Sequence, residues 1–200
     1  MSDPRIPPAE ITGLQGAMVK RYSRKMLGEV PEPLGMYWHN PRVLRTFLTI
    51  SAKAQKWDSC DEGLKSLAHM AAVALVGCSF CLDLGYFMAQ NEGLDLTKAR
   101  EVPRWRESDV FTPRERDVME YAEAMSGTPP TVTDDLVERL RIPLGEAALV
   151  ELTAHIALAN FAARSNLAFG IHAQGFAASC GLPPLAPASD ASTDLPLEVA

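Results

Sequence analysis

The chain has 200 residues, of which 47% are hydrophobic and 22% are charged, and this composition is typical of one soluble domain. A disordered chain and a fibrous repeat are therefore excluded. The formal net charge is −6 and the basic residues are scattered along the chain, so no nucleic-acid partner is expected. The longest apolar run, from Met70 to Leu82, is shorter than the roughly 20 residues of a membrane-spanning helix, so no membrane partner is expected either. The N-terminus lacks an apolar stretch behind a basic start, which favours a cytoplasmic location.

Prolines divide the chain, and the segments between them carry the apolar spacing that is typical of helices. Asp61 and Thr112 stand where helix N-caps are expected, and Thr112 is followed by Pro113 and Glu115 in the pattern of a capping box. The patterns predict six helices in chain order, over residues 41–56, 61–76, 79–91, 112–125, 133–141 and 145–170. The charged residues around Trp105 alternate in sign and predict a solvated loop.

No stretch alternates apolar and polar residues in the way that a β-strand requires, so the sequence predicts an all-α fold, a helical bundle. We expect a single domain over residues 1–180. Residues 181–200 are rich in proline, small residues and acids, and they predict a flexible C-terminal tail. The pattern from Gly145 to Gly170 is apolar on more than one face, which predicts a homo-oligomer.

The cysteines carry the main chemical signal. Cys78 and Cys81 form a CxxC pair at the predicted start of a helix, where exposed amides and the helix dipole stabilise a thiolate and a disulfide can close across one turn. The pair predicts thiol–disulfide exchange, and the alternative is two small buried residues in an apolar hairpin. Cys60 and Cys180 stand alone, and no further ligand set accompanies the pair, so neither a metal nor another cofactor is expected.

The pair lies within a longer pattern that runs from about residue 37 to residue 170. Its elements are Trp38-His39 with Pro41, a buried helix that leads into Gly77-Cys78-Ser79-Phe80-Cys81, the Phe111-Thr112-Pro113-Arg114-Glu115-Arg116 start of a later helix, and Glu151-Leu152-Thr153. In these elements the chain resembles the carboxymuconolactone decarboxylase family, specifically its alkyl hydroperoxidase D (AhpD)-like branch. The resemblance implies an AhpD-like helical bundle that assembles as a trimer or hexamer, or as a dimer, and a cysteine pair that reduces peroxides or exchanges disulfides.

The resemblance also assigns roles. It implies that Cys81 attacks a peroxide or disulfide substrate, and that Cys78 resolves the product and later exchanges with a thiol reductant protein. The redox enzymes of the branch carry a Glu and a His that relay a proton, and this chain has Ser66 and Gly85 at those positions. His69 lies three residues after Ser66 on the same helical face and is a candidate substitute base. Peroxidase activity is therefore expected to be weak.

Two other classes of function stay open. A lyase or isomerase acting on a small acidic or lactone metabolite would use Glu151, His155 or His69 as acid–base groups and would not need cysteine redox chemistry. Glu151 and His155 are four residues apart on one predicted helix, and they form either a proton-handling site or a structural polar pair. The other class is a binding or assembly protein without turnover. Asp83, in the first turn after Cys81, is expected to cap its own helix.

Overall fold

The computed structural model describes residues 4–91 and 93–188, and within these residues the regular structure is entirely helical. The elements are α1 (Gly13–Leu27), α2 (Glu32–Trp38), α3 (Pro41–Ala54), α4 (Glu62–Val76), α5 (Ser79–Asn91), α6 (Leu96–Glu101), the short 3₁₀ helix η1 (Val102–Arg104), α7 (Pro113–Ser126), α8 (Asp134–Leu144), α9 (Glu146–Phe169) and α10 (Phe176–Ser179). The prediction of an all-α fold is confirmed.

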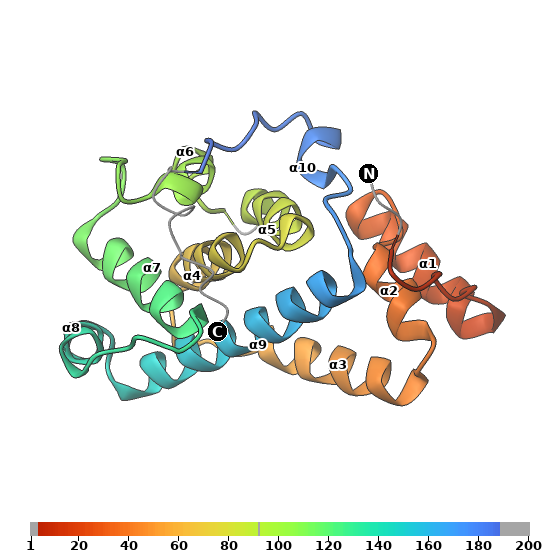
Figure 1. Cartoon of the computed structure of the whole chain (residues 1–200), viewed down its shortest axis with the longest axis horizontal. Coiled ribbons are helices and arrows are strands. Elements are labelled where there is room, and N and C mark those ends of the chain that lie inside the picture. Colours follow the sequence, from red (N-terminus) through yellow and green to blue (C-terminus); the bar gives the residue numbers. More distant parts are fainter. Residues whose placement is uncertain (1–3, 92, 189–200) are drawn as a thin grey trace, which may run out of the picture.

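Helix α4 is the centre of the bundle. It packs against α7, α9 and α5, and α1, α2 and α3 gather at one end of the molecule (Figure 1). Leu67 and Met70 of α4 are completely buried, as are Leu152 and Ile156 on the facing side of α9. This burial explains the nearly continuous apolar character of the α4 sequence, because a helix that is surrounded by neighbours has no polar face.

The predicted helix ends are confirmed where a local cap defines them. The Asp61 side chain accepts a hydrogen bond from the backbone N–H of Leu64, and Thr112 and Glu115 form the expected capping box. Helix α8 runs to Leu144, beyond the predicted end at residue 141. Pro143 lies in the last turn of α8 and does not end the helix. The helix ends at Gly145, whose φ of 79° is a conformation that favours glycine.

Two helices at the N-terminus were not predicted. α1 and α2 lie in the segment that the prolines seemed to break, but Pro31 and Pro33 stand at the start of α2, where the missing N–H costs nothing. Gly35 of α2 lies against the preceding chain, and a Cβ at this position would come within 2.9 Å of Pro8. These two helices matter for function because they form one wall of the pocket described below.

The loop predicted around Trp105 is partly a helical turn, and Trp105 itself is buried. Its ring N–H donates a hydrogen bond of 2.9 Å to Glu123 of α7, while Arg106 stacks over the ring. The solvated loop was a wrong prediction at this residue, because charge alternation does not show that one aromatic side chain in the segment turns inward.

The described part of the predicted tail, residues 181–188, runs back along the bundle. The backbone N–H of Ala186 donates to the carbonyl of Arg100, whose side chain donates to Pro184. Residues 189–200 of the predicted tail lie outside the described residues. In the described part of the chain, no helix has the length and apolar character needed to cross a membrane.

Candidate active site

The cysteine pair lies at the junction of α4 and α5. Gly77, with φ 83°, ends α4 in the left-handed conformation and turns the chain, so that Cys78 directly precedes the first residue of α5. The Sγ atoms of Cys78 and Cys81 are bonded as a disulfide, and their Cα atoms are 5.3 Å apart. The backbone N–H of Cys81 donates to Cys78 Sγ at 3.3 Å. This N–H and the helix dipole favour negative charge on Cys78 when the disulfide is reduced.

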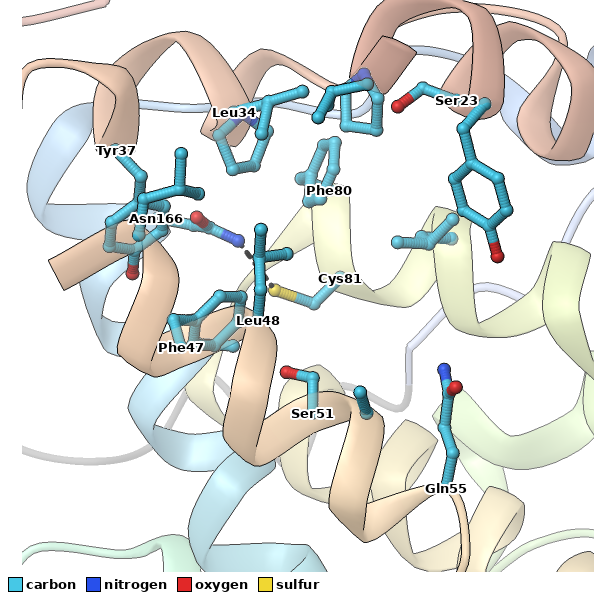
Figure 2. Close-up of a pocket in the computed structure, with 18 of the residues that line it drawn as sticks. Ser23, Leu34, Tyr37, Phe47, Leu48, Ser51, Gln55, Phe80, Cys81 and Asn166 are labelled. Carbon is cyan, nitrogen blue, oxygen red and sulfur yellow. Dashed lines mark hydrogen bonds between the residues drawn. The ribbon is translucent and has the colours of Figure 1, made fainter. Parts of the chain in front are cut away.

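One of the two sulfurs faces a pocket. A cavity of about 610 Å³ lies between α1, α2 and α3 on one side and α5 and α9 on the other (Figure 2). Cys81 lines this cavity and Cys78 does not, and only 1% of Cys78 is exposed. A small molecule in the pocket therefore meets Cys81, while Cys78 is placed behind it.

Asn166 of α9 holds the sulfur of Cys81 from the pocket side. Its Nδ2 donates a hydrogen bond to Cys81 Sγ at 3.4 Å (Figure 2), and both residues are buried. An amide donor stabilises a sulfur that becomes negatively charged when the disulfide opens. Sequence reasoning missed Asn166 because it is 85 residues from Cys81, and nothing in the sequence distinguishes it from Asn160 on the same helix.

His69 lies beside the cysteine pair, in the space that a side chain at position 85 would fill. A Cβ on Gly85 would come within 3.2 Å of His69 Cδ2, and the His69 ring hydrogen-bonds the backbone of Cys81. The glycine at position 85, where the resemblance predicts a His, therefore gives room to a histidine from α4. Burial, together with the neighbouring His155, lowers the pKa of His69 to about 4, so its ring is neutral at pH 7.

His155 of α9 contacts His69 edge to face, with ring centroids 6.0 Å apart. Burial first, and then the positive charge of Lys65, lower the pKa of His155 to about 4 as well. Unfolded histidine binds a proton near pH 6.5. Between about pH 6.5 and pH 4 the unfolded chain therefore binds two protons that the folded chain does not bind. The free energy of unfolding falls as the pH is lowered through this window.

We expect each of these two histidines to remove about 3 kcal/mol of stability across that window. Urea unfolding of the His69→Gln, His155→Gln double variant between pH 6.5 and pH 5 checks this. The variant should lose stability with a clearly smaller slope than the wild type. Equal slopes would mean that the two rings are not buried in their neutral form.

Glu151 has a structural role. Its carboxylate accepts a hydrogen bond from Lys65 Nζ at 2.8 Å and from the backbone N–H groups of Ser59 and Cys60, so it ties α9 to α4 and to the loop before it. Burial would raise the pKa of Glu151, but the hydrogen bond from Lys65 and those from the backbone outweigh it and lower the pKa. Glu151 and His155 are therefore not a mutual hydrogen-bonded pair, and neither lines the pocket that Cys81 faces.

Asp83 and Cys60 have surroundings that favour a structural role. Asp83 does not cap its own helix, because its carboxylate accepts the backbone N–H groups of Gly175, Phe176 and Ala177 at the start of α10. Cys60 is buried, and burial followed by the nearby Glu151 carboxylate raises the pKa of its thiol to about 11. The side chains described by the structure contain no cluster of three or more His, Cys, Asp or Glu residues that could hold a metal ion.

Comparisons with known proteins give the family. A model of the carboxymuconolactone decarboxylase family matches residues 41–124. The uncharacterized protein YnjA of Escherichia coli (strain K12) is 35% identical over 161 residues, which cover 80% of this chain and 87% of YnjA. The chain belongs to the carboxymuconolactone decarboxylase family.

Solved structures agree with this family assignment at the level of the fold. The debrominase Bmp8, as a cysteine-to-alanine variant in complex with 2,3,4-tribromopyrrole, matches with a TM-score of 0.76 at 20% identity, over 88% of this chain and 97% of Bmp8. A peroxidase-related protein from Ralstonia eutropha JMP134, described as an alkylhydroperoxidase AhpD core, matches with a TM-score of 0.75 at 18% identity, over 88% of this chain and 95% of its own. This member of the carboxymuconolactone decarboxylase family therefore has the AhpD-core helical fold.

Proposed function

We propose that the protein is a thiol–disulfide oxidoreductase in which Cys78 and Cys81 cycle between a dithiol and a disulfide. The observation that carries the proposal is that the bonded pair sits at a helix start with one sulfur, Cys81, facing a pocket of about 610 Å³. A pair without redox function has no need to present one sulfur to a cavity. The comparisons support this chemistry, because the proteins with a similar fold include one described as an alkylhydroperoxidase AhpD core.

In the proposed cycle the substrate oxidises the cysteine pair and external thiols reduce it again. The Cys81 thiolate attacks one oxygen of a peroxide and the O–O bond breaks, so that Cys81 becomes a sulfenic acid and the leaving alkoxide takes a proton from water to give an alcohol. Cys78 then attacks the Cys81 sulfur, the S–O bond breaks, water leaves, and the disulfide forms. With a disulfide substrate the first step gives a mixed disulfide and a free thiol instead. Two external thiols, from a small molecule or from the dithiol of a reductant protein, return two electrons and two protons to the pair and are themselves oxidised to a disulfide.

The electrostatics match this division of roles. The N–H of Cys81 and the start of α5 stabilise negative charge on Cys78, which suits a resolving thiolate that attacks an already oxidised Cys81. Asn166 Nδ2 stabilises charge on Cys81. Neither group transfers a proton, so both act by holding charge in place.

We assign His69 to positioning rather than to proton transfer. A group with a pKa of about 4 is a weak base toward a thiol, whose proton leaves near pH 8.5. The chain then lacks the general acid–base assistance of the complete relay, which is worth roughly 10²–10⁴-fold in rate. Peroxide reduction is expected to be slow, and disulfide exchange, which needs less proton transfer, is expected to be the faster reaction.

The substrate that we propose is a small apolar molecule. The lining of the pocket is mostly apolar, and the ligand recorded with the structurally similar debrominase, 2,3,4-tribromopyrrole, is a small apolar ring. Both observations support an organic peroxide or disulfide over hydrogen peroxide or a charged metabolite.

Titration of free thiols under denaturing conditions tests the proposed function. The reduced chain has four thiols, and mild oxidation of the native protein should remove two of them. Cys60→Ser and Cys180→Ser are matched controls that should still lose two. The proposal fails if Cys78→Ser loses as many thiols as the wild type.

We also propose that the chain assembles with copies of itself. An apolar groove runs between α3 and α9, lined among others by Val43, Ile50 and Phe161, and Phe161 is 49% exposed. Single exposed apolar residues are common, but a continuous apolar groove is typical of an interface. Light scattering at micromolar concentration should show an oligomer, and Phe161→Glu should dissociate it while Lys53→Glu, on an exposed part of α3, should not. A monomeric wild type would contradict the proposal.

A further inference from the structure

The pocket beside Cys81 carries no formal charge. Its described lining residues include no Asp, Glu, Lys or Arg, and the histidine among them, His69, is neutral at pH 7. An ion that enters such a pocket gives up its hydration without gaining an opposite charge, so ions are disfavoured. The walls include the Tyr37 ring, stacked on Phe47 at 5.2 Å, and the Phe80 ring, which suit a flat apolar body (Figure 2).

The same pocket has unsatisfied polar atoms among its buried lining. Tyr37 Oη and Asn166 Oδ1 belong to side chains that are more than nine-tenths buried, and neither oxygen has a hydrogen-bond partner. Buried polar atoms without a partner destabilise the fold, so their presence beside a cavity points to a group that supplies the missing hydrogen bonds. The Asn166 amide is oriented by the bond from its Nδ2 to Cys81 Sγ, and this orientation leaves Oδ1 as an acceptor.

Both oxygens have almost no accessible surface, so a ligand reaches them when the side chains turn slightly toward the cavity. The terminal torsion of an Asn side chain is broad, so the amide can turn toward a ligand without leaving its rotamer. Tyr37 Oη is able to donate or to accept, whereas Asn166 Oδ1 only accepts. The ligand group must therefore carry a hydrogen that it can donate.

We propose that the pocket beside Cys81 selects an uncharged, ring-sized apolar molecule that carries one hydroxyl or N–H group, which binds to Asn166 Oδ1 and Tyr37 Oη. The inference deepens the proposed function, on which it rests, by naming the substrate class of the same site. It excludes carboxylates and other anions, and it prefers molecules with a donor group over equally apolar molecules without one.

Three naphthalene probes of matched size test the proposal by their own fluorescence. They are 2-naphthol, which is neutral and donates a hydrogen bond, 2-methoxynaphthalene, which is neutral and does not donate, and 2-naphthoate, which is an anion at pH 7. With the oxidised wild-type protein, 2-naphthol should bind about tenfold more tightly than the ether, the difference that one hydrogen bond typically makes. The naphthoate should bind more weakly than both.

Tyr37→Phe removes only the hydroxyl and keeps the ring that stacks on Phe47. In this variant both 2-naphthol and the ether should bind about threefold to tenfold more weakly, because the oxygen of each loses the hydrogen bond from Tyr37 Oη, while the preference for 2-naphthol, which depends on Asn166 Oδ1, stays about tenfold. Unchanged binding of both probes would overturn the assignment of Tyr37, and equal binding of naphthol and ether to the wild type would overturn the proposal as a whole.

A charge placed at the pocket tests the exclusion of anions by a gain of binding. Leu48 lines the pocket and is 44% exposed, so Leu48→Lys tolerates a polar head group. It should strengthen the binding of 2-naphthoate about fivefold and leave the ether unaffected. Leu75→Lys is the matched control, since Leu75 is also partly exposed but does not line the pocket. Tight binding of the naphthoate to the wild type, or an equal gain in both variants, would overturn the exclusion of ions.

These measurements use the disulfide form of the protein and need no turnover. Selective binding without loss of two thiols on oxidation would leave the ligand class standing while the redox function fails. Loss of two thiols without selective binding would leave the redox function standing while the proposed ligand class fails.

Discussion

Replacing Cys81 with Ser is expected to abolish the consumption of an apolar hydroperoxide or aryl disulfide in the presence of dithiothreitol. The loss should be on the order of 10³-fold or more, because a serine hydroxyl without a base is a far weaker nucleophile than a thiolate. Cys78→Ser should differ in kind, since Cys81 still faces the pocket and can react once. We expect consumption of about one substrate per chain at the wild-type rate, followed by much slower turnover.

Stopped-flow consumption measured at several ratios of substrate to protein separates these two outcomes. Cys180→Ser is the matched control, because Cys180 is a free and exposed thiol far from the pair in sequence. It should turn over like the wild type. A burst in Cys81→Ser and none in Cys78→Ser would reverse the assignment of the two cysteines.

Lys65→Met is expected to destabilise the fold by about 3–5 kcal/mol, the typical cost of leaving a buried charge without its partner. The side chains of Lys65 and Glu151 are only 4% and 8% exposed, and removal of the ammonium leaves the Glu151 carboxylate with backbone donors alone. Lys65→Met combined with Glu151→Gln should be more stable than Lys65→Met alone, because the neutral amide no longer needs a cation and its oxygen can still accept from the backbone.

Urea unfolding at pH 7 measures these differences. Glu62→Gln serves as the control, since Glu62 also contacts Lys65 but is 62% exposed, and its loss should cost less than about 1 kcal/mol. A similarly small cost for Lys65→Met would show that the ion pair is hydrated rather than buried.

Local signals in the sequence predicted most of the helices. Asp61 and Thr112 act through neighbours three residues away, so their caps can be recognised without tertiary information. The long apolar pattern predicted α9 almost to the residue, from Glu146 to Phe169. α2 escaped prediction because prolines near a helix start look the same in sequence as prolines that break a helix.

The site was only partly predictable because segments that are far apart in the chain build it. The sequence pointed to Cys78 and Cys81, but which sulfur faces a cavity depends on α2, α3 and α9, which lie far away in the chain. The same holds for Lys65 and Glu151, 86 residues apart. The contact between His69 and Gly85 could be suspected from the sequence. Gly85 has no side chain, and the imidazole of His69 on α4 lies in the space that a side chain would fill.

We propose that Cys81 reacts with the substrate and that Cys78 resolves the adduct on Cys81, and the most direct measurement of these roles traps that adduct. The Cys78→Ser, Cys180→Ser variant is treated with 2,2′-dithiodipyridine, an uncharged aromatic disulfide, and the adduct is located by peptide mass spectrometry. Cys60 should stay unmodified, because it is buried and its thiol has a pKa of about 11. The account predicts one thiopyridyl group per chain, on Cys81, and its release as the Cys78–Cys81 disulfide forms when Cys78 is present. An unreactive Cys81, or an adduct that persists on Cys81 when Cys78 is present, would contradict it.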